Sequence, residues 1–177
     1  MTELPKGWVT ASVGELFEYE RGVTYSKADA TKILGENRLP VLRANNFNRD
    51  FDLSDLVYLP KEMISEDQIL RRGDLLFAMS SGSMSHVGKC ITVKKSIQAG
   101  FGAFCGILRP IDEHFSGLFG HIFQGRTFRN YIEEQAAGTN INNLKRDALL
   151  NFPLAVPPLN EQRRIVEKIE AMFERID

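Results

Sequence analysis

The chain has 177 residues, of which 43% are hydrophobic, so it is long enough for one domain with a buried core. Its 22 basic and 23 acidic side chains argue against a protein that coats nucleic acid through bulk charge, although a local basic face remains open. No apolar run approaches the ~20 residues needed to cross a bilayer, and residues 1–6 lack a signal-peptide core, so we expect a cytoplasmic protein.

The first third of the chain alternates apolar runs with polar stretches. In residues 10–20, apolar side chains recur at helical spacing, which predicts a short helix that Gly22 ends. Residues 38–59 hold an apolar run at each end and the polar stretch 43–50 between them. This pattern predicts short strands joined by an exposed loop.

The middle of the chain has the character of a β-sheet. Apolar and β-branched runs at residues 72–79, 87–93 and 102–108 predict strands. Small polar residues fill positions 80–86 and favour an exposed loop between the first two runs. We therefore expect an α+β fold, with a mostly antiparallel twisted sheet or partial barrel and peripheral helices.

The last third of the chain is predicted to be helical. Residues 113–137 have apolar side chains at helical intervals, which predicts one or two helices ended by Gly138. A polar patch at 138–143 precedes a short helix that runs from Leu144 to about Leu150. The two cysteines, in the strand runs before this region, are expected to be buried free thiols: Cys90 and Cys105.

An amphipathic helix is predicted after the Pro157-Pro158 pair. Asn160 is the expected N-cap, and Glu161 suits the positive end of the helix dipole. One apolar stripe follows along the helix, formed by Ile165, Ile169, Met172, Phe173 and Ile176. No stop signal follows the stripe, so we expect either a longer native chain or a partner helix.

Several blocks, in this order, resemble a known family. They are LPKGW (4–8) with VGEL (13–16), GDLLF (73–77), GTNINNL (138–144) and FPLAVPPLNEQRRIV (152–166). Together they resemble the specificity subunit of type I restriction-modification systems, in which antiparallel helices separate two target-recognition domains and dock methyltransferase subunits. The resemblance implies one DNA-binding target-recognition domain at residues 1–156 and the start of a spacer helix at residues 157–177.

Three polar stretches, at residues 43–49, 80–89 and 139–145, carry donors and acceptors suited to base edges and phosphates. The candidate DNA-contacting residues are Arg43, Asn45, Asn46, Ser81, Ser83, Lys89, Asn140 and Lys145. Arg43 can grip guanine bidentately, either neighbouring asparagine can pair with adenine, and Lys89 suits a phosphate. The alternative interpretation is that each of these side chains only forms a solvated turn.

The formal charge hides a polarised chain. Residues 71–95 contain five basic side chains and one acidic one, whereas residues 50–70 contain one basic and six acidic side chains. Such a distribution can present one basic surface to DNA. The alternative is that Arg71 or Arg72 pairs with the acidic segment before it.

Motifs for chemistry are absent from the sequence. Residues 82–90 imitate a phosphate-binding P-loop, but the glycine spacing is one residue too long and Cys90 replaces the magnesium-binding hydroxyl. The histidines and cysteines lack paired zinc-ligand spacing, and neither an Asn/Asp-Pro-Pro-aromatic methyltransferase motif nor a Pro-Asp nuclease motif occurs. We therefore expect no catalysis, no metal and no cofactor.

Two classes of function remain. The leading hypothesis is a recognition module that binds double-stranded DNA and directs methyltransferase and restriction subunits to a short target. The alternative is a protein-interaction module without base readout, which would use the last helix and the helices at residues 113–137. A weaker third hypothesis is the recognition part of a single-chain restriction-methyltransferase. The apolar stripe can either pair with a second copy of the helix or pack on its own domain.

Overall fold

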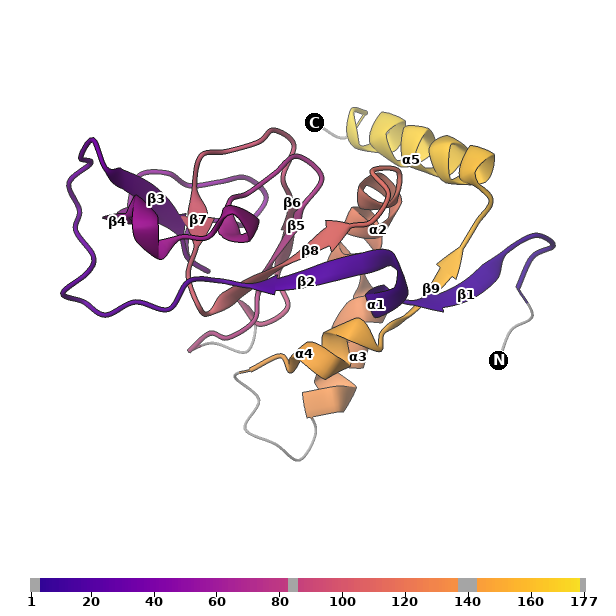
Figure 1. Ribbon diagram of the computed structural model, residues 1–177. Coiled ribbons are helices and arrows are strands. Elements are labelled where there is room, and N and C mark those ends of the chain that lie inside the picture. The colour runs from indigo at the N-terminus through magenta and orange to yellow at the C-terminus, as the bar shows by residue number, and fades with distance from the viewer. Residues whose placement is uncertain (1–3, 83–85, 137–142, 176–177) are drawn as a thin grey trace.

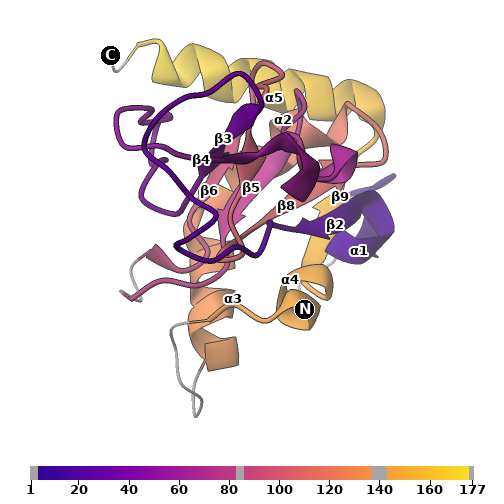
Figure 2. The same ribbon diagram turned by 60° about the vertical axis from the view of Figure 1, so that its left-hand side comes forward.

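The computed structural model describes residues 4–82, 86–136 and 143–175 (Figures 1 and 2). In chain order its elements are β1 (Val9–Ser12), α1 (Val13–Leu16), β2 (Phe17–Arg21), β3 (Arg38–Leu42), β4 (Val57–Pro60), η1 (Lys61–Met63), η2 (Glu66–Gln68), β5 (Leu75–Ala78), β6 (Cys90–Thr92), β7 (Gly100–Phe101), β8 (Cys105–Pro110), α2 (Phe115–Gln124), α3 (Arg126–Ala136), α4 (Arg146–Leu150), β9 (Pro153–Val156) and α5 (Leu159–Phe173). Helices and antiparallel sheets are combined, so the expected α+β class is confirmed. No helix within these residues is long and apolar enough to cross a membrane.

The central sheet has the strand order β2-β8-β5-β6, with antiparallel pairing throughout. Every residue of β5 is buried, because apolar clusters cover both faces of the sheet at this strand. Leu75 and Phe77 belong to the cluster beneath α2 and α3, whereas Leu76 and Ala78 belong to the cluster on the opposite face. This double burial explains why the sequence of β5 is continuously apolar rather than alternating.

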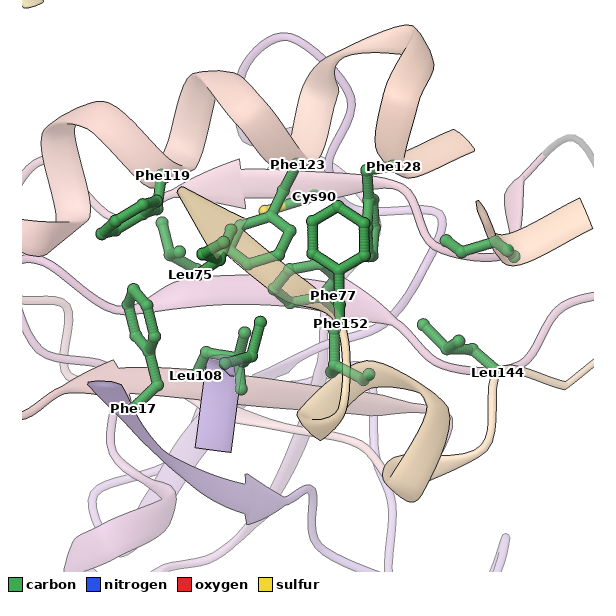
Figure 3. Close-up of a cluster of buried hydrophobic side chains, with 14 of the residues drawn as sticks. Phe17, Leu75, Phe77, Cys90, Leu108, Phe119, Phe123, Phe128, Leu144 and Phe152 are labelled. Carbon is green, nitrogen blue, oxygen red and sulfur yellow. The ribbon is translucent and has the colours of Figure 1, made fainter. Parts of the chain in front are cut away.

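Aromatic rings dominate the core between the central sheet and the helices (Figure 3). The Phe77 ring contacts Phe123 and Phe128 edge to face, with centroid distances of 5.2 and 5.9 Å. Phe128 also meets Phe152 at 5.0 Å, and this contact joins α3 to the segment before β9. Edge-to-face geometry is the favoured arrangement for aromatic pairs, so these rings fix the helices on the sheet.

The expected helix at residues 10–20 is wrong. The segment forms β1, a single turn α1 and then β2, which pairs with β8. Phe17 and Tyr19 point to the helix-side cluster, while the intervening Glu18 is exposed, so the period in β2 is that of a strand. Gly22 ends no helix: a Cβ there would lie 2.2 Å from the carbonyl oxygen of Gly102, so glycine permits this close approach.

A smaller sheet with the order β4-β3-β7 packs beside the central one. Both strands expected in residues 38–59 are present as β3 and β4, which pair antiparallel. Strand β7 joins β3 in parallel, with Leu42 opposite Phe101. The segment between β3 and β4 is not wholly exposed as expected, because Asn46 and Phe47 are buried.

Helix α5 lies across α2, as Figure 1 shows, and its first half packs on the domain. Ile165 and Val166 contact the helix-side core. Further along the stripe, Met172 and Phe173 are 57% and 56% exposed, although Phe173 stacks on the His121 ring at 5.9 Å. Ile176 lies outside the described residues. The expected N-cap is wrong, since Pro158 occupies that position and accepts the backbone bonds of the first turn.

Candidate nucleic-acid interface

The described parts of the three polar stretches singled out in the sequence meet at one end of the central sheet. Asn143 forms a β-bridge with Ser80, and the Leu144 amide donates to the Met79 carbonyl at 2.7 Å. The Lys89 ammonium donates to the Ala44 carbonyl at 3.0 Å, which ties the segment after β3 to the same place. Segments about 40 to 100 positions apart in the sequence therefore form one surface. Loops held in this way on a rigid sheet commonly form binding sites.

Asn46 shapes the segment after β3 from inside. Its side chain is 0% exposed, and its carbonyl oxygen accepts from the Arg43 amide at 3.0 Å. Its amide nitrogen donates to the carbonyls of Asp52 and Asp55, each at 3.1 Å. A buried amide satisfied in this way presents nothing to a base edge, so Asn46 organises the loop, and the exposed Asn45 beside it remains a candidate contact.

Arg43 is held by Asp55. One guanidinium nitrogen, Nη2, donates to the Asp55 carbonyl at 2.8 Å and to its carboxylate at 2.9 Å, and the side chain is 31% exposed. Hydrogen bonds from Lys32 and from Arg43 lower the pKa of Asp55, so its carboxylate is charged at neutral pH. Arg43 must share or leave this carboxylate in order to grip guanine with two donors.

Lys89 combines a structural contact with a charge at the surface. Its ammonium group lies 5.0 Å from the centre of the buried Phe47 ring, in addition to its bond to Ala44. Partial burial lowers the pKa of Lys89. Lys89 thus holds the segment after β3 in place through Ala44 and Phe47. It also adds a cation next to the point where the polar stretches meet.

The other candidate residues differ in how they are placed. Ser81 is half-buried just beyond β5, and Lys145 is exposed directly before α4. Ser83 and Asn140 lie outside the described residues. The structure adds one candidate contact residue, Phe104. The sequence pattern placed it in a strand, but it lies in the β7–β8 turn with 70% of its surface exposed.

A basic hollow continues from Lys89 along the side of the domain. It has a volume of about 2340 Å³ and lies between the segment after β3, the turn after β6 and helices α2 and α3. Its basic side chains include Arg49, Arg72, Lys94, Lys95 and Arg126. They outnumber the acidic ones, which are Asp50, Glu113, Glu170 and Glu174. A concave surface rich in lysine and arginine is suited to a phosphate backbone.

Comparisons with known proteins agree with the resemblance of the sequence blocks. The model of the type I restriction modification DNA specificity domain matches residues 5–177. The EcoKI specificity subunit of Escherichia coli K12 is 43% identical, and the StySPI specificity subunit of Salmonella potsdam is 41% identical; each alignment covers 99% of this chain and 38% of the relative. The chain thus spans under half the length of these relatives.

Solved structures share the fold at low sequence identity. The HsdS subunit of Thermoanaerobacter tengcongensis superposes with a TM-score of 0.67 at 19% identity, over 99% of this chain and 39% of that one. A chain from a structural study of assembly and conformational transition in the type I R-M system gives a TM-score of 0.69, also at 19% identity, over 99% and 40% of the two chains. The match of the family model over nearly the whole chain leads to the conclusion that this protein belongs to the type I restriction-modification DNA specificity domain family.

Proposed function

We propose that this chain is one target-recognition domain of a type I specificity subunit, which reads a short sequence in double-stranded DNA in the cytoplasm. The observation that carries the proposal is the convergence of three polar segments at one end of the central sheet, beside a basic hollow. Base-edge donors at the convergence point would supply specificity, and the cations around them would bind phosphates. Residues 1–156 would form the recognition domain, and residues 157–177 would begin the spacer.

The proposed role is recognition without catalysis. The chain would direct methyltransferase and restriction subunits to the target, and these partners would carry out the chemistry. The two cysteines are poorly suited to catalysis, because burial raises the pKa of Cys105 to about 12 and also raises the pKa of Cys90. A thiol that stays protonated at neutral pH is a poor nucleophile. Cys90 and Cys105 also belong to the clusters on opposite faces of the sheet.

Two substitutions should separate base reading from phosphate binding. Arg43→Ala is expected to weaken binding to the cognate duplex by about 1–3 kcal/mol and to change binding to a scrambled duplex little. Lys89→Ala should weaken both complexes alike, because a phosphate contact carries no sequence information. Mapping methylated sites in cells that carry the intact system identifies the target, and fluorescence anisotropy then measures both affinities.

Conservative variants serve as controls for these substitutions. Lys89→Arg keeps the charge and should retain most of the affinity, while Arg43→Lys keeps the charge but loses the bidentate fork. Equal losses from Arg43→Ala on cognate and scrambled duplexes would show that Arg43 contacts phosphate instead of a base.

We also propose that the second half of α5 pairs with a further helix. The exposed Met172 and Phe173 would be covered by a second copy running antiparallel, and burying each side chain would contribute up to about 1.5–3 kcal/mol. Sedimentation of the chain should therefore show a dimer that Met172→Glu with Phe173→Glu dissociates. Ile111→Glu, a control at an apolar side chain that is 61% exposed outside this helix, should leave the dimer intact. A parent chain that stays monomeric at high concentration would contradict the pairing.

A further inference from the structure

Phe104 is an aromatic side chain that the fold leaves in water. It is 70% exposed, whereas its neighbours Phe101 and Cys105 are both 0% exposed. A single exposed apolar side chain needs no explanation by itself. Its anchoring and its surroundings, however, set this one apart.

The backbone on both sides of the Phe104 ring is fixed. The Cys105 amide donates to the Gly102 carbonyl at 2.7 Å, which closes the turn. The Phe104 carbonyl accepts from the amides of Met79 and Ser80, at 2.8 and 3.1 Å. The turn is thus bonded directly to the end of β5, where the polar segments converge. A ring held on a rigid turn loses little conformational entropy when it binds a partner.

Basic residues lie on the segments next to the turn. Exposed Arg21 belongs to β2, where it pairs with Gly106, one residue after the turn. The Cγ atom of Arg43, whose guanidinium is bonded to Asp55, lies 3.8 Å from where a Cβ of Gly102 would be. Lys145 follows Leu144, which bonds to Met79 and so reaches the same strand end. An apolar protein partner would not require this charge, whereas nucleic acid offers both phosphates and the flat faces of bases.

We propose that Phe104 stacks against a base of the bound duplex and partly unstacks one base step. The inference rests on the proposed DNA binding and deepens it, because it adds an aromatic contact to the polar ones. Apolar wedges of this kind open flexible pyrimidine–purine steps most readily. Phe104 would thereby favour targets that contain such a step at the right place, without a hydrogen bond to any base.

The test uses the purified chain and a duplex that carries the target identified by methylation mapping. 2-Aminopurine, an adenine analogue whose fluorescence rises on unstacking, replaces each adenine of the two strands in turn. Wild type should raise the signal at one step, and Phe104→Ala should abolish that rise and weaken cognate binding about tenfold. Phe104→Trp, which keeps a stacking surface, should preserve both readouts. Ile111→Ala, beyond the opposite end of β8, is the matched control and should change neither.

The outcomes separate this inference from the proposed function. If wild type binds the target but Phe104→Ala keeps its affinity and fluorescence, the stacking contact is refuted and DNA recognition stands. If wild type binds no DNA, the proposed function and this inference both fail. Thermal melting checks that the alanine variant is folded; if it melts early, Phe104→Gln replaces it, and retained unstacking by that variant refutes the proposal equally.

Discussion

Asp74→Ala is expected to lower the free energy of unfolding by about 3–5 kcal/mol, because it removes one partner of a buried ion pair. The Asp74 carboxylate is 1% exposed and accepts from Nε and Nη2 of Arg109 at 2.9 and 2.8 Å. It also accepts from the Arg71 amide at 2.8 Å, which fixes the turn before β5. Without it, the largely buried Arg109 guanidinium would keep only the exposed carboxylate of Asp67, 3.9 Å from its Nη1, as a counter-charge. Urea unfolding followed by circular dichroism measures the loss.

A double substitution distinguishes the lost charge from lost packing. Asp74→Leu with Arg109→Met removes both charges and keeps apolar volume, so it should be markedly less destabilising than Asp74→Ala alone. If Asp74→Ala lowered the free energy of unfolding by less than about 1 kcal/mol, the pair would contribute no more than a weak surface ion pair, contrary to this prediction.

Phe77→Ala should destabilise the fold by a similar amount, about 3–5 kcal/mol. The ring is 0% exposed and packs against both Phe123 and Phe128, so its removal leaves a cavity between the sheet and both helices (Figure 3). Phe104→Ala is the matched control: it deletes the same ring from an exposed position and should change the unfolding free energy by less than about 0.5 kcal/mol. Comparable losses from the two variants in urea unfolding would be inconsistent with the described core.

These stability effects bear on the proposed interface because β5 supports it. Strand β5 starts directly after Asp74, presents Phe77 to the helices and ends at Ala78. The amide and carbonyl of the next residue, Met79, bond to the turn of Phe104 and to Leu144. Weakening the strand would therefore loosen the loops that meet at its end. A DNA-binding defect in a core variant must be compared with its stability before it is assigned to a lost contact.

Local patterns predicted much of the fold. Continuous apolar runs predicted β5 and most of β8, because apolar clusters cover both faces of these strands. The expected strand at 102–108 began too early, since residues 102–104 form the turn before β8. Residues 10–20 were wrongly predicted to form one helix. Three apolar side chains at helical spacing fit that helix, but they fit equally well a single helical turn followed by a strand that pairs with β8. Pairing between segments about 90 positions apart decided the outcome, and no local pattern records it.

The candidate site was less accessible to sequence reasoning. Polar composition identified the segments that meet, but not their convergence through Ser80 and Asn143. Asn45 and Asn46 are chemically identical in the sequence, and only the folded loop buries one and exposes the other. In the sequence, Phe104 looks like a core residue of an apolar strand. Its 70% exposure arises because it lies in a turn, and only the tertiary structure places it there.

A titration of the purified chain with DNA shows whether the chain itself reads DNA sequence. A duplex carrying the mapped target and a scrambled duplex of equal length are compared at about 50 and 200 mM salt. We expect tighter binding to the target at both salt concentrations. Both affinities should fall steeply as salt rises, because basic side chains of the protein bind the phosphates. Equal affinity for the two duplexes, or no binding that depends on salt, would contradict it and favour a protein-interaction module.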